Sequence, residues 1–227
     1  MNSTRRVVIA ASLILSGQIA SAQDIARYRV YALDSSVASV IAASGAPSAD
    51  AKTIHKRPAT IQELQWRAPY VTSTDTMADP VRDIAFTFYN DALYQVVVNY
   101  DRARTEGLTD KDILDALSAT YGAPGPPSPK TRTTPPADAF SDSVVLARWE
   151  TAESLMTLLR GAYPREFQLI LLSRPLGALA QNAIREAVRL DALDAPRRES
   201  EQRKKEAGDA IAARDQTRTT NKAAFRP

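Results

Sequence analysis

Residues 83–121 carry the sequence DIAFTFYNDALYQVVVNYDRARTEGLTDKDILDALSATY, and this stretch decides the fold. Apolar and polar residues alternate over 84–89 and again over 94–100, as they do in half-buried strands. Asn90 and Asp91 stand between the two runs, and both residue types tolerate the left-handed backbone of a tight turn. The stretch therefore predicts a β-hairpin with one apolar face that needs a cover.

A helix that can provide the cover follows in the same stretch. Gly107 interrupts the chain, and Thr109 stands three residues before Asp112, as in a capping box, although Glu or Gln is preferred there. Gly122-Ala-Pro124 ends the helix. Its apolar stripe is Ile113, Leu114, Leu117 and Tyr121. We expect this stripe to pack on the hairpin.

Composition excludes several classes of function. The chain has 227 residues, enough for one domain or two small ones, and 29 Lys+Arg against 26 Asp+Glu give no strong field for nucleic acid. Cysteine is absent, which removes disulfides, thiolate zinc sites and cysteine nucleophiles. The single histidine leaves no histidine pair for a metal. We expect no metal, no cofactor and no nucleic-acid partner.

Residues 1–22 have the pattern of an export signal. Two arginines precede a short apolar run over 7–15, which is too short to cross a bilayer. Ala20-Ser21-Ala22 fits the small-residue rule for cleavage, so the mature chain is expected to begin at Gln23. The alternative interpretation is an N-terminal membrane anchor. The prediction is a periplasmic or secreted protein.

The remaining pattern predicts short elements. Tyr28 to Leu33 is a strand or an extended lead-in, and Asp34 or Ser35 can cap a helix that runs to about Ser44. A polar connection containing His55 and Pro58 follows. Further strands are expected over 61–67, 145–150, 155–160 and 167–173, and a long amphipathic helix over 176–190.

Two passages share one order of elements. Each runs from a capped helix through Gly-Ala-Pro and a loop to a strand with a tryptophan, and then to a hairpin. Gly45 and Gly122 lie 77 positions apart, whereas Trp66 and Trp149 lie 83 apart, and the second, proline-rich loop absorbs the difference. A duplicated αβββ unit is one interpretation, and coincidence among short elements is the other.

The expected fold class is α+β, with two αβββ-like repeats in an antiparallel sheet, helices on one face, a long C-terminal helix and a charged tail. The expected boundaries are a signal peptide at 1–22, the first half with the helix of the second at 23–123, a proline-rich loop at 124–140, the remaining second half at 141–195 and the tail at 196–227.

This order of elements, from Tyr28 to Arg174, resembles that of two exported families. One is the tandem-repeat beta-lactamase inhibitor protein, and the other is the SmpA/OmlA type of outer-membrane assembly lipoprotein. The chain departs from both in having no cysteine for disulfides or for a lipid. The resemblance implies a protein that binds another protein of the envelope and carries over no binding residues.

Strand alternation assigns residues to the two faces of the sheet. The face under the helices is expected to take Leu64, Trp66, Ile84, Phe86, Phe88, Tyr94, Val96, Val98 and Trp149. The opposite face then takes Arg67, Tyr89, Gln95, Asn99, Arg148 and Glu150. Arginine and tyrosine among polar groups suit a protein interface, and an ordinary wetted sheet face is the other interpretation.

Each of the other candidate residues has both a functional and a purely structural interpretation. His55 is a catalytic base or an exposed loop residue, and Asp101 with Glu106 is a carboxylate pair or a strand end followed by a turn. Trp66 and Trp149 stack on a ligand or fill the core. No motif for a nucleophile or for a phosphate loop is present.

Two further segments are candidates for binding a partner or a surface. Residues 126–129, Pro-Pro-Ser-Pro, are a polyproline ligand or a stiff connector. The tail at 196–227 has nine basic and five acidic residues, a net charge of +4, and either forms a solvated, partly helical or disordered extension or contacts an anionic membrane surface. The leading hypothesis is a non-catalytic exported protein that binds an envelope protein; the alternative is a periplasmic hydrolase with an unrecognised site.

Overall fold

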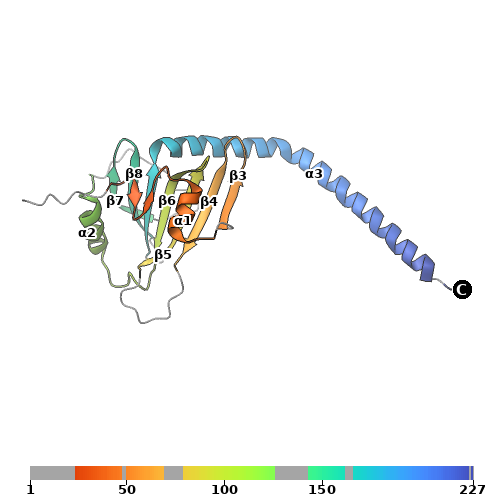
Figure 1. Ribbon diagram of the computed structural model, residues 1–227, viewed down its shortest axis with the longest axis horizontal. Coiled ribbons are helices and arrows are strands. Elements are labelled where there is room, and N and C mark those ends of the chain that lie inside the picture. Colours follow the sequence, from red (N-terminus) through yellow and green to blue (C-terminus); the bar gives the residue numbers. More distant parts are fainter. Residues whose placement is uncertain are drawn as a thin grey trace, which may run out of the picture.

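The computed structural model of the protein describes residues 24–47, 50–68, 79–125, 143–161, 166–224 and 226. In these ranges the chain forms a seven-stranded antiparallel sheet, a two-stranded sheet and three helices, so the predicted α+β class is confirmed (Figure 1). The strands are β1 (Arg27–Tyr28), β2 (Tyr31–Ala32), β3 (Ala51–His55), β4 (Ile61–Arg67), β5 (Val81–Tyr89), β6 (Ala92–Tyr100), β7 (Ser143–Glu150), β8 (Ser154–Gly161) and β9 (Phe167–Ser173). The helices are α1 (Val37–Ser44), α2 (Asp110–Tyr121) and α3 (Arg174–Ala224).

The large sheet has the strand order β3-β4-β5-β6-β9-β8-β7. One unit of the chain is α1-β3-β4-β5-β6, and a second unit is α2-β7-β8-β9. The two units meet where β6 pairs with β9 at the middle of the sheet, and each unit runs outward from that pair in the same order. The strand β3 has no counterpart in the second unit, and the duplication of an αβββ unit stays a prediction.

The hairpin in the deciding stretch is confirmed. Asn90 has φ 46° and Asp91 has φ 71°, the left-handed backbone that a two-residue turn between twisted strands requires. The turn also organises its surroundings, because the Asn90 side-chain oxygen accepts a hydrogen bond from the backbone N–H of Thr60 at 2.9 Å. The hairpin therefore positions the start of β4 as well as its own strands.

The helix boundaries follow local sequence chemistry. In α2 the capping box of Thr109 and Asp112 is formed as predicted. In α1 the cap is Ser36, one or two residues later than predicted, and its hydroxyl accepts a hydrogen bond from the Ser39 backbone N–H. Gly45 ends α1 with φ 66°, a conformation that costs glycine little.

The face under α1 and α2 forms the main core. Strand register places six apolar side chains in one row across six strands, and each is at most 3% exposed. The row is Leu64, Phe86, Val96, Leu171, Met156 and Trp149. Trp149 is thus a core residue, and Trp66, partly buried, packs against the same core.

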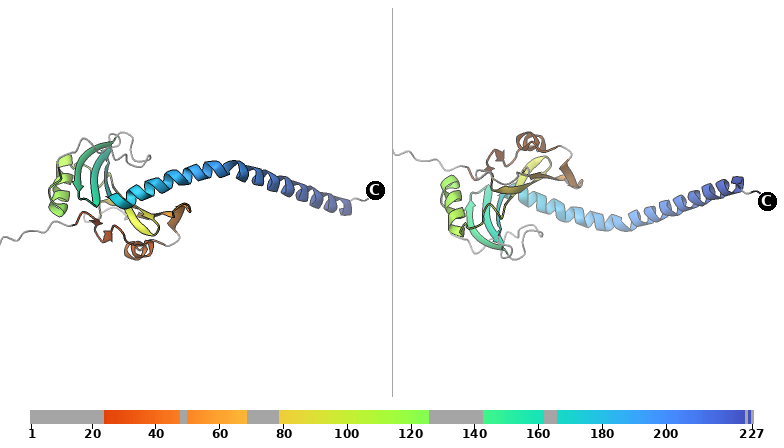
Figure 2. Two further views of the ribbon diagram at one scale, coloured as in Figure 1. Left: turned by 90° about the horizontal axis from the view of Figure 1, so that it is seen from above. Right: turned by 90° about the horizontal axis from the view of Figure 1, so that it is seen from below.

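The first part of α3 lies on the other face of the sheet, a placement that Figure 2 shows from above and below. Ala180, fully buried, packs there with Ile61 and Tyr94. Tyr94 was predicted on the face under α1 and α2. That prediction is wrong, because the register shifts between Thr87 and Phe88 and the resulting bulge turns Tyr94 to the α3 side.

Beyond Pro196, α3 leaves the sheet. Residues 196–224, which we call the projecting segment, continue the helix, and every one of them is exposed (Figures 1 and 2). The tail expected to be loose is therefore a solvated helix. Arg57 holds its base to the body through ion pairs with Asp191 and Asp194. Among the described helices, none is both long and apolar enough for a membrane crossing.

One strand was not predicted. The sequence at 51–55, AKTIH, was interpreted as part of a polar connection, but it forms the edge strand β3 beside β4. Ile54 is 51% exposed, and Lys52 and Thr53 are exposed too, so the strand has no buried side that would produce an alternating pattern. Edge strands of this kind depend on backbone pairing with a neighbour, which local sequence does not reveal.

Candidate functional site

The predicted partner-binding residues share one face but do not form one patch. Register places Arg67, Tyr89, Gln95, Arg148 and Glu150 on the α3 side of the sheet, as strand alternation predicts. Arg67 lies on β4 and Arg148 on β7, which are five strand spacings, about 24 Å, apart. Gln95 is buried, and Tyr89 packs with the residues around Ala180 of α3. The face is therefore not an open surface.

A polar network occupies one end of that face. The Asn99 amide donates to Asp83 at 2.5 Å, and the Gln168 amide donates to the Asn99 oxygen at 2.8 Å. Arg82 donates to Asp83 at 2.8 Å and to Glu166 at 3.2 Å. These hydrogen bonds connect β5, β6 and β9 across the joint between the two units. The network stabilises the joint and leaves Asn99, one of the predicted interface residues, engaged within the fold.

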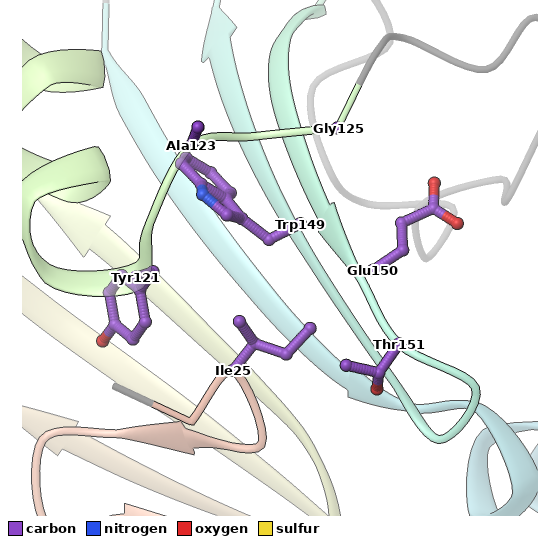
Figure 3. A pocket seen from close by; sticks show the side chains of 7 residues that line it. All are labelled: Ile25, Tyr121, Ala123, Gly125, Trp149, Glu150 and Thr151. Atoms are coloured by element: carbon purple, nitrogen blue, oxygen red, sulfur yellow. The ribbon is translucent and has the colours of Figure 1, made fainter. Parts of the chain in front are cut away.

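A hollow at the edge of β7 is the best-formed candidate site (Figure 3). It has a volume of about 470 Å³ and draws its lining from four parts of the chain: the segment before β1, the end of α2 with its exit, β7 and the turn after β7. The described lining residues are Ile25, Tyr121, Ala123, Gly125, Trp149, Glu150 and Thr151. We call this hollow the Trp149 pocket.

The fold already engages the polar groups of the Trp149 pocket. The Trp149 indole N–H donates to the backbone oxygen of Gly122 at 2.7 Å. The Glu150 carboxylate pairs with Arg174 at the start of α3. The Thr151 hydroxyl accepts a hydrogen bond from the Ser154 backbone N–H at 2.9 Å. The surface that the hollow presents is about equally polar and apolar.

The exit from α2 forms the pocket rim. Gly125 donates its backbone N–H to the Arg148 carbonyl at 2.9 Å, and this isolated bridge holds the segment after α2 against the edge of β7. Ala123 and Gly125 are exposed, whereas Trp149 is 3% exposed. The rim is therefore accessible, and the floor is part of the core.

Tyr121, which lines the pocket, lies close to two other tyrosines, Tyr28 and Tyr100. Burial raises the pKa of Tyr121 and of Tyr100 to about 12, and it raises the pKa of Tyr28 still further. Tyr28 and Tyr100 share a hydrogen bond between their hydroxyl groups. These hydroxyls stay protonated at neutral pH, so they serve as hydrogen-bonding groups rather than as bases.

Arg29 and Asp79 form an ion pair beside the tyrosines. The guanidinium binds the carboxylate through two hydrogen bonds of 2.5 and 2.7 Å, and its carbon lies 5.3 Å from the centre of the Tyr28 ring. The Arg29 hydrogen bonds hold the pKa of Asp79 below its usual range. The sequence analysis missed this pair because the two residues lie 50 positions apart and neither stands in a motif.

A second hollow of about 440 Å³ contains the carboxylate pair considered from the sequence. Arg82, Asp101, Arg102, Ala103 and Glu106 line it. The Asp101 carboxylate accepts a hydrogen bond from the Arg104 backbone N–H at 3.1 Å, and β6 ends one residue earlier. The predicted strand end and turn are thus confirmed.

The remaining sequence candidates contribute little to a site. His55 is half-buried at the end of β3, opposite Ile61. In the described part of the chain, no three His, Cys, Asp or Glu side chains come together in a group that could hold a metal ion. The Pro-Pro-Ser-Pro segment at 126–129 and the predicted signal peptide lie outside the described residues.

In the Trp149 pocket the rings of Tyr121 and Trp149 are buried, and the indole, carboxylate and hydroxyl groups of Trp149, Glu150 and Thr151 are bonded within the fold. A scan against protein-family models found no matching family, and searches of the curated proteins and of the solved structures found no match either.

Proposed function

We propose that this chain is an exported, non-catalytic protein that binds another protein of the cell envelope through the Trp149 pocket. The observation that carries the proposal is the chemistry of that pocket. About half of its exposed lining is apolar, and the indole of Trp149, the carboxylate of Glu150 and the hydroxyl of Thr151 are bonded within the fold. A partner inserting an apolar side chain would leave none of these groups without a partner.

The location of the pocket supports the same proposal. It lies at the edge strand β7, where the exposed rim residues Ala123 and Gly125 border the hollow. Val144 and Val145 of the same strand are 47% and 41% exposed, so β7 also carries exposed apolar side chains away from the pocket. An apolar anchor pocket beside further exposed apolar surface is the arrangement of many protein interfaces.

Export is proposed from the sequence pattern of residues 1–22. The resemblance of element order to exported inhibitor and envelope-assembly proteins supports a binding role in the same compartment. N-terminal sequencing of the secreted or periplasmic chain should begin at Gln23 or within a few residues of it. An uncleaved product in the cytoplasm would contradict the export proposal and leave the binding proposal to be tested separately.

The binding proposal is tested by two matched variants of the mature chain. Ala123→Arg places a long charged side chain at the rim of the Trp149 pocket, and Ala103→Arg makes the same change in the second hollow. Both positions are exposed, so both variants should unfold at nearly the wild-type temperature. In pull-downs from an envelope extract, we expect Ala123→Arg to lose the partner and Ala103→Arg to retain it.

Other outcomes would overturn the proposal. Equal recovery of the partner by both variants would exclude the Trp149 pocket as the binding site. Loss of the partner in Ala103→Arg alone would move the site to the hollow containing Asp101 and Glu106. Hydrolysis of ester, amide or glycoside substrates by the mature chain would favour the alternative, a periplasmic hydrolase.

A further inference from the structure

The pattern of ion pairs along α3 changes near Arg203. On the side of the body, Arg197 pairs with Asp194 and Arg203 pairs with Glu199. Beyond that point, five cations of α3 form no salt bridge with any described residue. They are Lys204, Lys205, Arg214, Arg218 and Lys222. The outer part of the projecting segment therefore carries cations that the fold does not neutralise.

Four of these cations lie on one line along the helix. Steps of three or four residues connect Lys204, Ala207, Ile211, Arg214, Arg218 and Lys222, and residues at this spacing face the same side. We call this line the basic ridge. Arg214, Arg218 and Lys222 follow one another at intervals of four, a spacing at which like charges repel. The cations of the ridge therefore repel one another, and binding to an anionic surface would reduce this repulsion.

The acidic residues of the same segment lie mostly elsewhere. Glu206 and Asp209 lie on the side of the helix away from the ridge, and Asp215 lies on its flank next to Arg218. Beyond Lys205, which lies on the side of Asp209, the segment therefore has one cationic side and one side that is acidic or neutral. The overall composition does not reveal this separation of charge, because 29 Lys+Arg and 26 Asp+Glu nearly balance over the whole chain.

We propose that the basic ridge binds the phosphate headgroups of an anionic phospholipid bilayer, with the projecting segment lying along the surface. The charge of the ridge is complementary to such a surface, and from Lys204 to Lys222 it spans about 27 Å of helix. Ile211 is the one large apolar side chain on the ridge, so the contact is at the headgroups rather than within the acyl chains.

Two other occupants fit the ridge less well. A second copy of the chain would bring like charges together along Arg214, Arg218 and Lys222. Nucleic acid is anionic too, but the proposed export takes the chain away from it. The inference goes beyond the proposed function, and its test needs no protein partner, so either proposal can fail without the other.

The experiment measures sedimentation of the mature chain with vesicles. The wild type should bind vesicles containing phosphatidylglycerol and not vesicles of phosphatidylcholine alone, and added salt should release it. A ridge variant combines Arg214→Gln, Arg218→Gln and Lys222→Gln. We expect its binding to fall by roughly 100-fold, from the loss of three cations near the surface.

A control variant removes the same charge elsewhere, through Lys52→Gln, Arg185→Gln and Arg189→Gln. All three residues are exposed and lie outside the projecting segment. The control should bind vesicles almost as the wild type does, and circular dichroism should show similar helix content in both variants. This result would show that position on the ridge, rather than net charge, determines binding.

The remaining outcomes overturn the proposal. They are equal binding to the two kinds of vesicle, an equal loss in the control variant, and tighter binding to a short DNA duplex than to anionic vesicles at the same salt. Concentration-dependent dimerisation that the ridge variant abolishes, without any change in vesicle binding, would assign the ridge to a second copy instead.

Discussion

The carboxylate of Asp91 accepts a hydrogen bond of 3.0 Å from the backbone N–H of Val37, the first residue of α1. The turn between β5 and β6 thus caps a helix that lies 54 positions earlier in the chain. Leu93 reinforces the contact, because its backbone N–H and carbonyl bond to Ser35 and Asp34. A single turn therefore connects the sheet to the helix that covers it.

Two substitutions of Asp91 distinguish its role in the turn between β5 and β6 from its hydrogen bond to α1. Asp91→Asn retains both the side-chain acceptor and the tolerance of φ 71°, so stability should change by less than about 0.5 kcal/mol. Asp91→Gly retains the backbone freedom but removes the hydrogen bond to Val37, and should cost about 0.5–1.5 kcal/mol. Urea unfolding of the two variants measures the difference. Equal stability would mean that the hydrogen bond to Val37 contributes nothing.

Substitution of Gly177 by alanine tests how closely α3 approaches the sheet. A Cβ at this position would lie 3.0 Å from Leu172 Cδ1, whereas nothing lies within 4 Å of a Cβ at Gly208. Alanine favours a helix by up to about 1 kcal/mol over glycine, so Gly208→Ala should leave the stability of the body unchanged and increase helix content. Gly177→Ala should instead destabilise the body by about 1 kcal/mol.

The double variant Gly177→Ala with Leu172→Ala provides the check for this contact. If the clash is the cause, the two changes together should cost less than the sum of their separate effects. Additive effects in chemical unfolding would place the cost of Gly177→Ala elsewhere.

Asp79 should make stability depend on pH on the acidic side. The hydrogen bonds from Arg29 lower its pKa in the folded protein, so the folded state binds this proton less readily than the unfolded state does. The stabilisation that the ionised Asp79 provides is present above its unfolded pKa of about 3.9. It is lost as pH falls through the lower pKa of Asp79 in the folded protein. Asp79→Asn should therefore show a weaker loss of stability between neutral pH and pH 3 than the wild type.

The control for this measurement is Asp209→Asn, which removes an exposed carboxylate from the projecting segment, where it has no salt bridge to a described residue. Its acid unfolding profile should follow that of the wild type. Identical profiles for all three proteins would show that the pair of Arg29 and Asp79 does not contribute to acid stability.

Removal of the projecting segment should leave the body intact. A chain that ends at Ala195 retains Asp191 and Asp194, the partners of Arg57, and loses only exposed helix. Its thermal midpoint should therefore stay within about 2–4 °C of the wild type, the shift that corresponds to ~1 kcal/mol at this size. Helix content should fall sharply. A larger drop in the midpoint would show that the segment packs on the body.

Local patterns predicted the elements whose chemistry is local. The alternation around Asn90 and Asp91 predicted the hairpin, and Thr109 with Asp112 predicted the start of α2. The spacing of apolar residues did not predict how far α3 extends, because a proline usually ends a helix and Pro196 therefore predicted the start of the tail. The helix continues through that residue, and Figure 2 shows it bending part-way along its length.

The candidate site was less accessible to sequence analysis. Trp149 was recognised as a matched aromatic residue, but Ile25 and Ala123 reach the same hollow from distant parts of the chain and stand in no motif. The basic ridge did leave a signal, the interval of four between Arg214, Arg218 and Lys222. The net charge of residues 196–227 does not reveal the ridge, because the ridge is visible only at helical intervals.

The pairing of β6 with β9 has a kinetic consequence. The hairpins β5–β6 and β8–β9 close short loops, whereas the β6–β9 ladder, from Gln95 opposite Leu172 to Asn99 opposite Gln168, joins strands separated by α2, β7 and β8. Closing that long loop carries an entropy cost before any contact is made, so we expect formation of the ladder to limit the folding rate. Truncation of Val98 or Leu169 in this ladder should slow refolding, while truncation of Val40 in α1 should mainly accelerate unfolding.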